Sequence, residues 1–358
     1  MKKWLVPLLP ALWLLMSGCT GLPAAREMGD MALLRTMGVD VSPAGVAITG
    51  STGPRAKGIQ GEGQGALILE ADRESLSAAC LAIQGQSDSY VFFGYVEQLL
   101  VGQGLAERGV RPVLDYFARD AQLGLGAQMW LVRADTARQA LAAGGDQGVE
   151  SRLETIRNDS KMGIAQFTRT AGEVYTDLLE LGCGYIPALA PDGEGGAVLA
   201  ERGYAILRGE SLAGYLDGEA AKGLEMLAGG AQTDILQAEV AGNKVSVKMT
   251  MAHTRSHLEF QGGRPSSLKL ACKVEGRLAE YERRLSDPER QELKEMLERQ
   301  EQARLEEAMK WLQAWGTDCA GLGAKAAAGR PIQWQRIRES WPEWFSQVPV
   351  EIRVEVNI

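Results

Sequence analysis

Three alternating stretches in the carboxyl-terminal half decide the fold class. They read VSVKMTM at residues 245–251, LKLACKV at residues 268–274 and VEIRVEVNI at residues 350–358. Successive side chains of a β-strand point to opposite faces, so each stretch places apolar side chains on one face and largely polar ones on the other. This alternation is typical of strands in an antiparallel sheet that is buried on one face only.

The apolar positions of these stretches define a predicted core face. Its residues are Val245, Val247, Met249, Met251, Leu268, Leu270, Cys272, Val274, Val350, Ile352, Val354, Val356 and Ile358. Residues 262–265 read GGRP and predict a hairpin turn between the first two strands. We therefore expect an amphipathic, antiparallel sheet.

A long helix is predicted between the hairpin and the last strand. Ser286 is a capping residue, Pro288 suits the first turn, and Gly316 ends the helix after about Trp315. Its charge-dense segment, residues 289–307, is interpreted as a solvated face. Helices packed on one face of an antiparallel-rich sheet define a multi-domain α+β fold rather than a doubly wound α/β fold.

The amino-terminal half alternates shorter elements. We expect a helix with Pro112 in its first turn, a helix capped by Asp135 and a mostly helical stretch over residues 151–181. The turn-rich segment APDGEGG at residues 190–196 is the best candidate linker. Domains commonly hold about 100–200 residues. The chain of 358 residues is therefore divided into domains at residues 19–190 and 191–358.

Residues 1–18 predict an export signal that is removed. Two lysines precede a short, proline-interrupted apolar run, which is shorter than the roughly 20 residues of a membrane-spanning helix. Residues 15–19 read LMSGC and resemble a bacterial lipobox. That resemblance implies that Cys19 becomes the first mature residue and carries a diacylglycerol that anchors the chain to a membrane. The alternative is an ordinary secretory signal followed by an unmodified cysteine.

Composition disfavours nucleic acid and metal as partners. The chain has 38 basic and 46 acidic side chains, a formal charge of −8, whereas nucleic acid requires clustered cations. Its only histidines, His253 and His257, lie in a strand-like pattern that would separate them by about 13 Å, too far to share a metal ion. The glycine clusters lack the Lys-Ser/Thr of a phosphate-binding loop. We therefore predict no cofactor.

Cysteines and tryptophans each leave two interpretations open. Apart from Cys19, the cysteines are Cys80, Cys183, Cys272 and Cys319. Export would permit disulfides, but Cys80 and Cys272 lie on apolar stripes and favour buried thiols. The aromatic cluster consists of Trp334, Trp341, Trp344 and Phe345. It could form a binding platform, but we favour a helix that packs its rings on the terminal sheet.

Several further stretches occur in a recognisable order. They are FFGY at residues 92–95, LDYFARD at residues 114–120, GYAIL at residues 203–207 and LAGYL at residues 212–216. The tail adds Gln313, Asp318, Gly321, Gly323, Pro331, Trp334, Trp341 and Phe345. Behind a lipobox, this order resembles the Ger(x)C family, the lipoprotein C subunits of GerA-type spore germinant receptors. Residues 114–120 are similar to a family stretch that ends in a D-x-x-x-R-[DN] element.

The resemblance implies a non-enzymatic subunit tethered through Cys19 to the outer face of the spore inner membrane. It would act beside two integral membrane subunits, A and B, in the response to small nutrient germinants. The main alternative is a solute-binding lipoprotein of an importer, but two hinged lobes fit the alternating strands poorly. A cell-wall hydrolase is disfavoured because no acid/base pair or metal set is recognisable.

Overall fold

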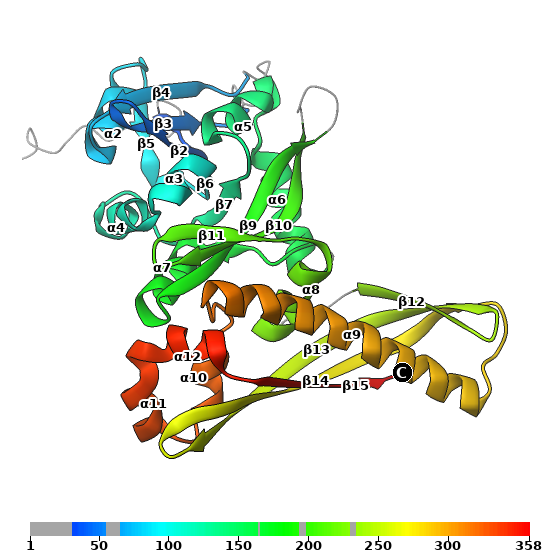
Figure 1. Ribbon diagram of the computed structural model, residues 1–358. Helices are drawn as coiled ribbons and strands as arrows, with labels where there is room; N and C mark the ends of the chain where they lie inside the picture. The colour runs from blue at the N-terminus through cyan, green and yellow to red at the C-terminus, as the bar shows by residue number, and fades with distance from the viewer. Residues whose placement is uncertain (1–30, 55–64, 164, 193–197, 230–233) are drawn as a thin grey trace, which may run out of the picture.

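The computed structural model describes residues 31–54, 65–163, 165–192, 198–229 and 234–358 (Figure 1). They form an amino-terminal body around a large mixed sheet and a carboxyl-terminal body around a smaller sheet. Two short strands, β1 (Met31–Leu33) and β5 (Tyr90–Phe92), form a separate parallel pair. The mixed α+β fold class predicted from the sequence is confirmed.

The large sheet has the strand order β11-β10-β9-β7-β6-β2-β3-β4, and β8 pairs with β7 outside this path. The bounds are β2 (Thr36–Ser42), β3 (Gly45–Ser51), β4 (Ile68–Arg73), β6 (Gln98–Gly102), β7 (Gln128–Val132), β8 (Arg169–Thr170), β9 (Cys183–Asp192), β10 (Val198–Arg208) and β11 (Ser211–Leu216). The central pairs β2–β6, β6–β7 and β7–β9 are parallel, and the outer pairs are antiparallel hairpins.

The central strands of the large sheet are buried on both faces. The helices around it are α2 (Leu76–Gln84), α3 (Gln103–Arg108), α4 (Arg111–Arg119), α5 (Ala137–Ala143), α6 (Glu150–Lys161) and α7 (Ala171–Glu180). Leu99 and Leu131 belong to the core formed with α2, α3, α4 and α7, whereas Leu100 and Trp130 belong to the core formed with α5 and α6. Continuous apolar runs in β6 and β7 are the consequence of this double burial.

The smaller sheet has the strand order β12-β13-β14-β15. Its strands are β12 (Asp234–Val240), β13 (Asn243–Gln261), β14 (Arg264–Tyr281) and β15 (Val350–Asn357). Its helices are α8 (Gly218–Ala228), α9 (Asp287–Trp315), α10 (Leu322–Ala326), α11 (Pro331–Ile337) and α12 (Trp341–Gln347). These helices cover one face, with α9 running across the strands, and no described element covers the other face (Figure 1).

Helix α9 has the limits that its sequence predicts. Ser286 and Glu289 form a reciprocal capping box, and the backbone of Gly316 is left-handed with φ of 64° directly after the last helical residue. A residue with left-handed backbone at this position ends the helix. Glycine adopts this conformation without strain because it has no Cβ atom to clash. The predicted hairpin of β13 and β14 and the predicted helix are therefore both confirmed.

The smaller sheet is antiparallel-rich, as predicted, and its last strand is the parallel member. Strand β15 pairs with β14 in parallel, from Leu268 opposite Val350 to Glu275 opposite Asn357. Parallel neighbours need a long crossover connection, which here is α9 with the three short helices that follow it. Alternation within a strand reports burial of one face and carries no information about strand direction.

A β-bulge corrects the predicted core face. Val245, Val247 and Met249 are buried as expected, but Met251 is 44% exposed. The register shifts between Met249 and Met251, so Thr250 is an extra residue and the following side chains change face. Ala252 takes the next buried position in place of Met251.

Two helix predictions also need correction. The N-cap of α5 is Thr136, whose hydroxyl accepts the N–H of Gln139, rather than Asp135 one residue earlier. Residues 151–181 form two helices, α6 and α7, separated by the short strand β8. Thr170 in β8 is the N-cap of α7 and forms a capping box with Glu173. This pair is a signal for the start of a second helix within the stretch that was interpreted as mostly helical.

Strand β10 joins the two bodies. Its residues Tyr204 and Ile206 belong to the core of the carboxyl-terminal body, and Ala205 and Leu207 belong to a core of the amino-terminal body. The boundary between the two domains proposed from the sequence falls in β9, which forms a hairpin with β10. The two bodies therefore share one strand, whose alternate side chains pack into the core of each.

Candidate functional site

The residue predicted to be modified, Cys19, lies outside the described residues, as does the predicted signal at residues 1–18. The other cysteines are all free thiols: Cys183, Cys272 and Cys319 are buried, and Cys80 is half-buried. Burial raises the pKa of both Cys80 and Cys272 to about 11. Thiols of this kind stay protonated and unreactive at neutral pH.

The two histidines lie on strand β13, as the alternating pattern predicted. His253 and His257 are exposed on the outer face, with Arg255 between them. In the paired strand β14 they lie opposite Lys273 and Lys269. Among the described residues no group of three or more His, Cys, Asp or Glu side chains could hold a metal ion.

The aromatic cluster packs into the carboxyl-terminal core. Trp341 is 5% exposed and Phe345 is fully buried, with ring centroids 5.8 Å apart. The indole Nε1 of Trp341 donates to the carboxylate of Asp318 at 2.8 Å, which also accepts two backbone N–H groups of α10. Burial raises the pKa of Asp318 to about 6. The cluster thus closes the core under α10, in agreement with the packing interpretation.

The stretch at residues 114–120 contributes to the amino-terminal body in two ways. Val113, Leu114 and Phe117 face the core, whereas Asp115 accepts a hydrogen bond from the hydroxyl of Tyr175 at 2.5 Å and so ties α4 to α7. Asp120 accepts the N–H groups of two residues in the loop after α4. These contacts give the acidic residues of the stretch a structural role.

Hollows of moderate size lie on either side of Tyr116. One of about 340 Å³ is lined by residues of α2, β5 and the loop after α4, including Cys80 and Phe93. The other, of about 560 Å³, lies between the start of α2 and α4 and includes Leu105 and Arg119. Neither contains a nucleophile paired with a base, which an acyl-transfer or hydrolytic site requires.

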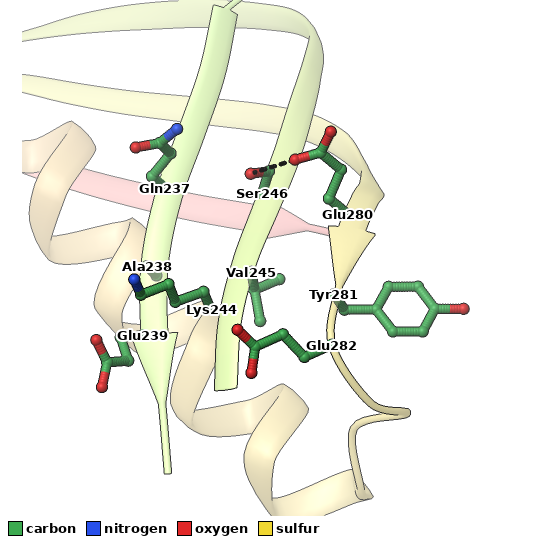
Figure 2. A pocket seen from close by; sticks show the side chains of 9 residues that line it. All are labelled: Gln237, Ala238, Glu239, Lys244, Val245, Ser246, Glu280, Tyr281 and Glu282. Atoms are coloured by element: carbon green, nitrogen blue, oxygen red, sulfur yellow. Dashed lines mark hydrogen bonds between the residues drawn. The ribbon is translucent and has the colours of Figure 1, made fainter. Parts of the chain in front are cut away.

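A wider hollow of about 650 Å³ lies on the outer face of the smaller sheet (Figure 2). Its polar side chains come from three adjacent strands, and Ser246 donates to Glu280 at 3.5 Å. Tyr281 points away from the hollow, and Lys244 lies opposite Glu239 in the strand register. The arrangement is an open, acidic surface rather than an enclosed site.

The sequence interpretation missed a buried charge cluster on α9. Glu301 is fully buried and Arg304 is 7% exposed, although this segment was interpreted as solvated. The guanidinium of Arg304 bonds to Glu301 at 3.0 Å, to Asp234 of β12 at 2.8 Å and to Glu219 of α8. Burial raises the pKa of Glu301 to about 7.

The signal for this cluster was present in the sequence. Glu301 continues the apolar stripe of α9, which runs through Leu293, Leu297, Leu305 and Leu312 at helical spacing. A charged residue at such a position must find a partner inside the protein, because an unpaired buried charge is costly. The cluster fastens α8, α9 and β12 together.

The described residues therefore offer surfaces and internal ties, and their hollows show no arrangement of groups that a known reaction would need. No helix among them is long and apolar enough to cross a membrane.

Comparison with known proteins covers nearly the whole chain. The family model described as "Spore germination protein N-terminal domain" matches residues 24–191, and the model described as "Spore germination B3/ GerAC like, C-terminal" matches residues 202–358. Among solved structures, the "Crystal Structure of the GerBC protein" aligns with a TM-score of 0.62 at 18% identity, over 90% of this chain and 96% of that one. A search of the curated proteins found no match.

The two family models follow each other in the order of the two bodies, and the fold agrees with that of GerBC over both. The resemblance noticed in the sequence is thereby confirmed, and the chain belongs to the Ger(x)C family of spore germinant receptor C subunits.

Proposed function

We propose that this chain is the lipoprotein C subunit of a spore germinant receptor and acts without catalysis. It would be tethered through Cys19 to the outer face of the spore inner membrane and act with two integral membrane subunits, A and B, in nutrient-triggered germination. The observation that carries this proposal is the match of both bodies, in order, to germination-family domains.

The lipid anchor follows from the sequence of the first residues. Removal of residues 1–18 would leave Cys19 at the amino terminus. Insertion of its acyl chains into a membrane would be favourable by about 0.8 kcal/mol for each CH₂ group that is buried. Eleven residues lie between Cys19 and Met31, where the described chain begins, and the twelve steps from one to the other span at most about 40 Å when fully extended. The folded bodies would thus stay within a thin layer above the membrane.

Confinement to this layer explains how a non-catalytic subunit can work through modest contacts. Tethering makes encounters with neighbouring membrane proteins effectively intramolecular, so weak surfaces are occupied at high effective concentration. We propose domains at residues 19–190 and 191–358 that act together through the shared strand β10.

Substitution of the anchor cysteine tests the proposal. We expect Cys19→Ala to move the protein into the soluble fraction and to impair the germination response to nutrients. Cys80→Ala is the matched control, because it removes a half-buried thiol and leaves the lipobox intact. Membrane fractionation, mass spectrometry of the mature amino terminus and a germination assay give the readouts.

Membrane retention of Cys19→Ala, or an unmodified mature terminus in the wild-type protein, would contradict the anchor. A thermal shift with a panel of amino acids and sugars tests the importer alternative. We expect no change in the melting temperature of the purified chain, and tight direct binding of a solute would favour a solute-binding lipoprotein instead.

A further inference from the structure

The outer face of the smaller sheet carries a band of basic side chains in an otherwise acidic protein. We call this band the basic stripe, and it comprises Lys248, His253, Arg255, His257, Lys269, Lys273 and Arg277 on β13 and β14. The bulge at Thr250 helps to create it, because it brings His253, Arg255 and His257 to the outer face. Both histidines of the chain lie in the stripe.

The pairing register of β13 and β14 places basic residues of the two strands opposite each other. His257 lies opposite Lys269, His253 opposite Lys273 and Lys248 opposite Arg277. Paired strands are about 4.8 Å apart, and side chains on one face repeat about every 6.7 Å along a strand. The stripe is therefore two strands wide and follows the length of the hairpin.

Along its β15 side the stripe meets a further arginine, Arg353, which lies outside the stripe itself. Ala271 is exposed and lies opposite Arg255 on one side and opposite Arg353 of β15 on the other. The strand that carries Ala271 separates the two arginines, so their backbones are about 10 Å apart and only a short side chain stands between them. Guanidinium groups bind carboxylates with paired, parallel hydrogen bonds.

Part of this charge is uncompensated. Lys269 pairs with Glu259 at 2.7 Å and Lys273 pairs with Glu275 at 3.5 Å. Lys248, Arg255, Arg277 and Arg353 have no ion-pair partner within the described part of the chain. The stripe is thus electropositive, whereas the whole chain has a formal charge of −8.

Acidic residues border the stripe on two sides. Glu351 and Glu355 of β15 lie opposite Lys269 and Lys273, and Glu280 and Glu282 line the hollow at the far end of the hairpin (Figure 2). A broad anionic plane, such as a layer of lipid phosphates, would be repelled by these carboxylates. A narrow anionic ligand would meet fewer of these carboxylates than a broad plane would, and opposite potentials must match across an interface.

We propose that the basic stripe binds an acidic linear segment of a protein partner, with carboxylates of that segment seated between Arg255 and Arg353. The inference rests on the proposed function in one respect, namely that the chain works by contacting other proteins. The contact is exposed and electrostatic, so it favours fast association and weakens as salt rises.

A direct binding experiment tests this proposal. The probe is a fluorescent decaglutamate peptide, and its anisotropy is measured with the purified full-length chain in a non-ionic detergent at about 50 mM salt. The test variant is Arg255→Glu with Arg353→Glu. The matched control is Arg290→Glu with Arg299→Glu, which reverses two exposed arginines of α9 and changes the net charge equally.

We expect the stripe variant to bind the peptide about tenfold more weakly or worse, and the control to stay within about twofold of wild type. Circular dichroism melting checks the fold, and Arg255→Gln with Arg353→Gln replaces the reversal if it fails to fold. Equal losses in both variants, or no binding by the wild-type chain, would overturn the proposal.

Vesicles of neutral lipid with and without phosphatidylglycerol form the second arm. If the extra binding to anionic vesicles depends on Arg255 and Arg353 and exceeds peptide binding, the stripe is a membrane surface and the proposal is wrong. Cys19→Ala should keep peptide binding. A failed anchor would therefore appear in fractionation only, and a failed stripe in peptide binding only.

Discussion

The two sheets of the molecule bury their strands differently. In the large sheet, neighbouring residues of β6, such as Leu99 and Leu100, enter two different cores, so both faces are covered. In the smaller sheet, Leu270 is buried while Ala271 and Lys273 beside it are exposed. The first sheet holds the amino-terminal body together, and the second also offers a surface that another molecule can reach.

This difference predicts where substitutions act. A side chain in the doubly covered sheet contributes to stability alone, because nothing outside the protein can contact it. On the outer face of the smaller sheet, substitutions should leave stability nearly unchanged and alter binding instead. Four measurements of unfolding test this difference between the two sheets.

The largest loss of stability is expected at Trp130, a fully buried residue of β7 whose side chain packs in the core formed with α5 and α6. Its Nε1 donates to Oε1 of Gln98 at 2.7 Å. Trp130→Ala leaves a large cavity and a buried amide without its partner, and should lower the free energy of unfolding by about 3–5 kcal/mol. Urea unfolding followed by circular dichroism measures it.

Arg277→Ala, on the outer face, is the comparison for Trp130→Ala and should change the free energy of unfolding by no more than about 0.5 kcal/mol. A loss below about 1 kcal/mol at Trp130 would mean that the large sheet is not packed tightly on both faces.

The bulge in β13 makes a second pair of substitutions informative. Met249 is 2% exposed, and Met251, two residues later, is 44% exposed. Met249→Ala should lower the free energy of unfolding by about 2–4 kcal/mol, and Met251→Ala by about 0.5 kcal/mol or less. Equal losses at both positions would indicate that β13 runs without the bulge and that the outer face carries different residues.

The buried cluster of α9 predicts a dependence of stability on pH. Burial raises the pKa of Glu301 to about 7 from the ordinary value of 4.5. The folded state therefore holds this proton more tightly than the unfolded state, so its contribution falls as pH rises from about 4.5 through about 7. Wild type should lose roughly 1–3 kcal/mol over this window relative to Glu301→Gln.

Glu292→Gln, at an exposed position of the same helix, is the control and should follow the wild-type curve. Asp318, whose pKa is raised to about 6, adds a fall common to all three proteins, which cancels in their differences. Parallel curves for wild type and Glu301→Gln would show that the carboxylate of Glu301 does not change its ionisation on folding.

The smallest effect is expected on the outer face itself. Lys273 and Glu275 are both about half exposed and pair at 3.5 Å. A double-mutant cycle with Lys273→Ala and Glu275→Ala should give a coupling below about 1 kcal/mol that falls further in high salt. A larger coupling that persists in high salt would mean that this face is less open to water than its exposure indicates.

Sequence patterns were informative where the structure depends on neighbouring residues. The limits of α9, the β13–β14 hairpin and the inner face of β14 follow from caps, turn residues and alternation, which act over a few positions. The same reasoning failed at Thr250 and in residues 151–181, because a bulge and a second helix start depend on what the backbone pairs with.

The candidate surface was less accessible to prediction than the fold. The pattern placed His253 and His257 on a strand and so removed the metal interpretation, but it did not show which cations stand beside them. The same face also carries Lys269, Lys273 and Arg353, which come from other strands. Their places beside the histidines depend on the pairing register of the strands, which the alternation within one strand does not reveal.

From the sequence alone, the order of short motifs indicated the family. Periodicity and capping, which are local properties of the chain, indicated the fold class, the long helix and the amphipathic strands. Only the tertiary structure decided the parallel pairing of β15, the burial of Glu301 with Arg304, and the meeting of Arg255 and Arg353 across Ala271. Each depends on contacts between residues far apart in the chain, such as those of Arg304 with Glu219 and Asp234, and these residues meet only when the sheets and their helices bury a common core.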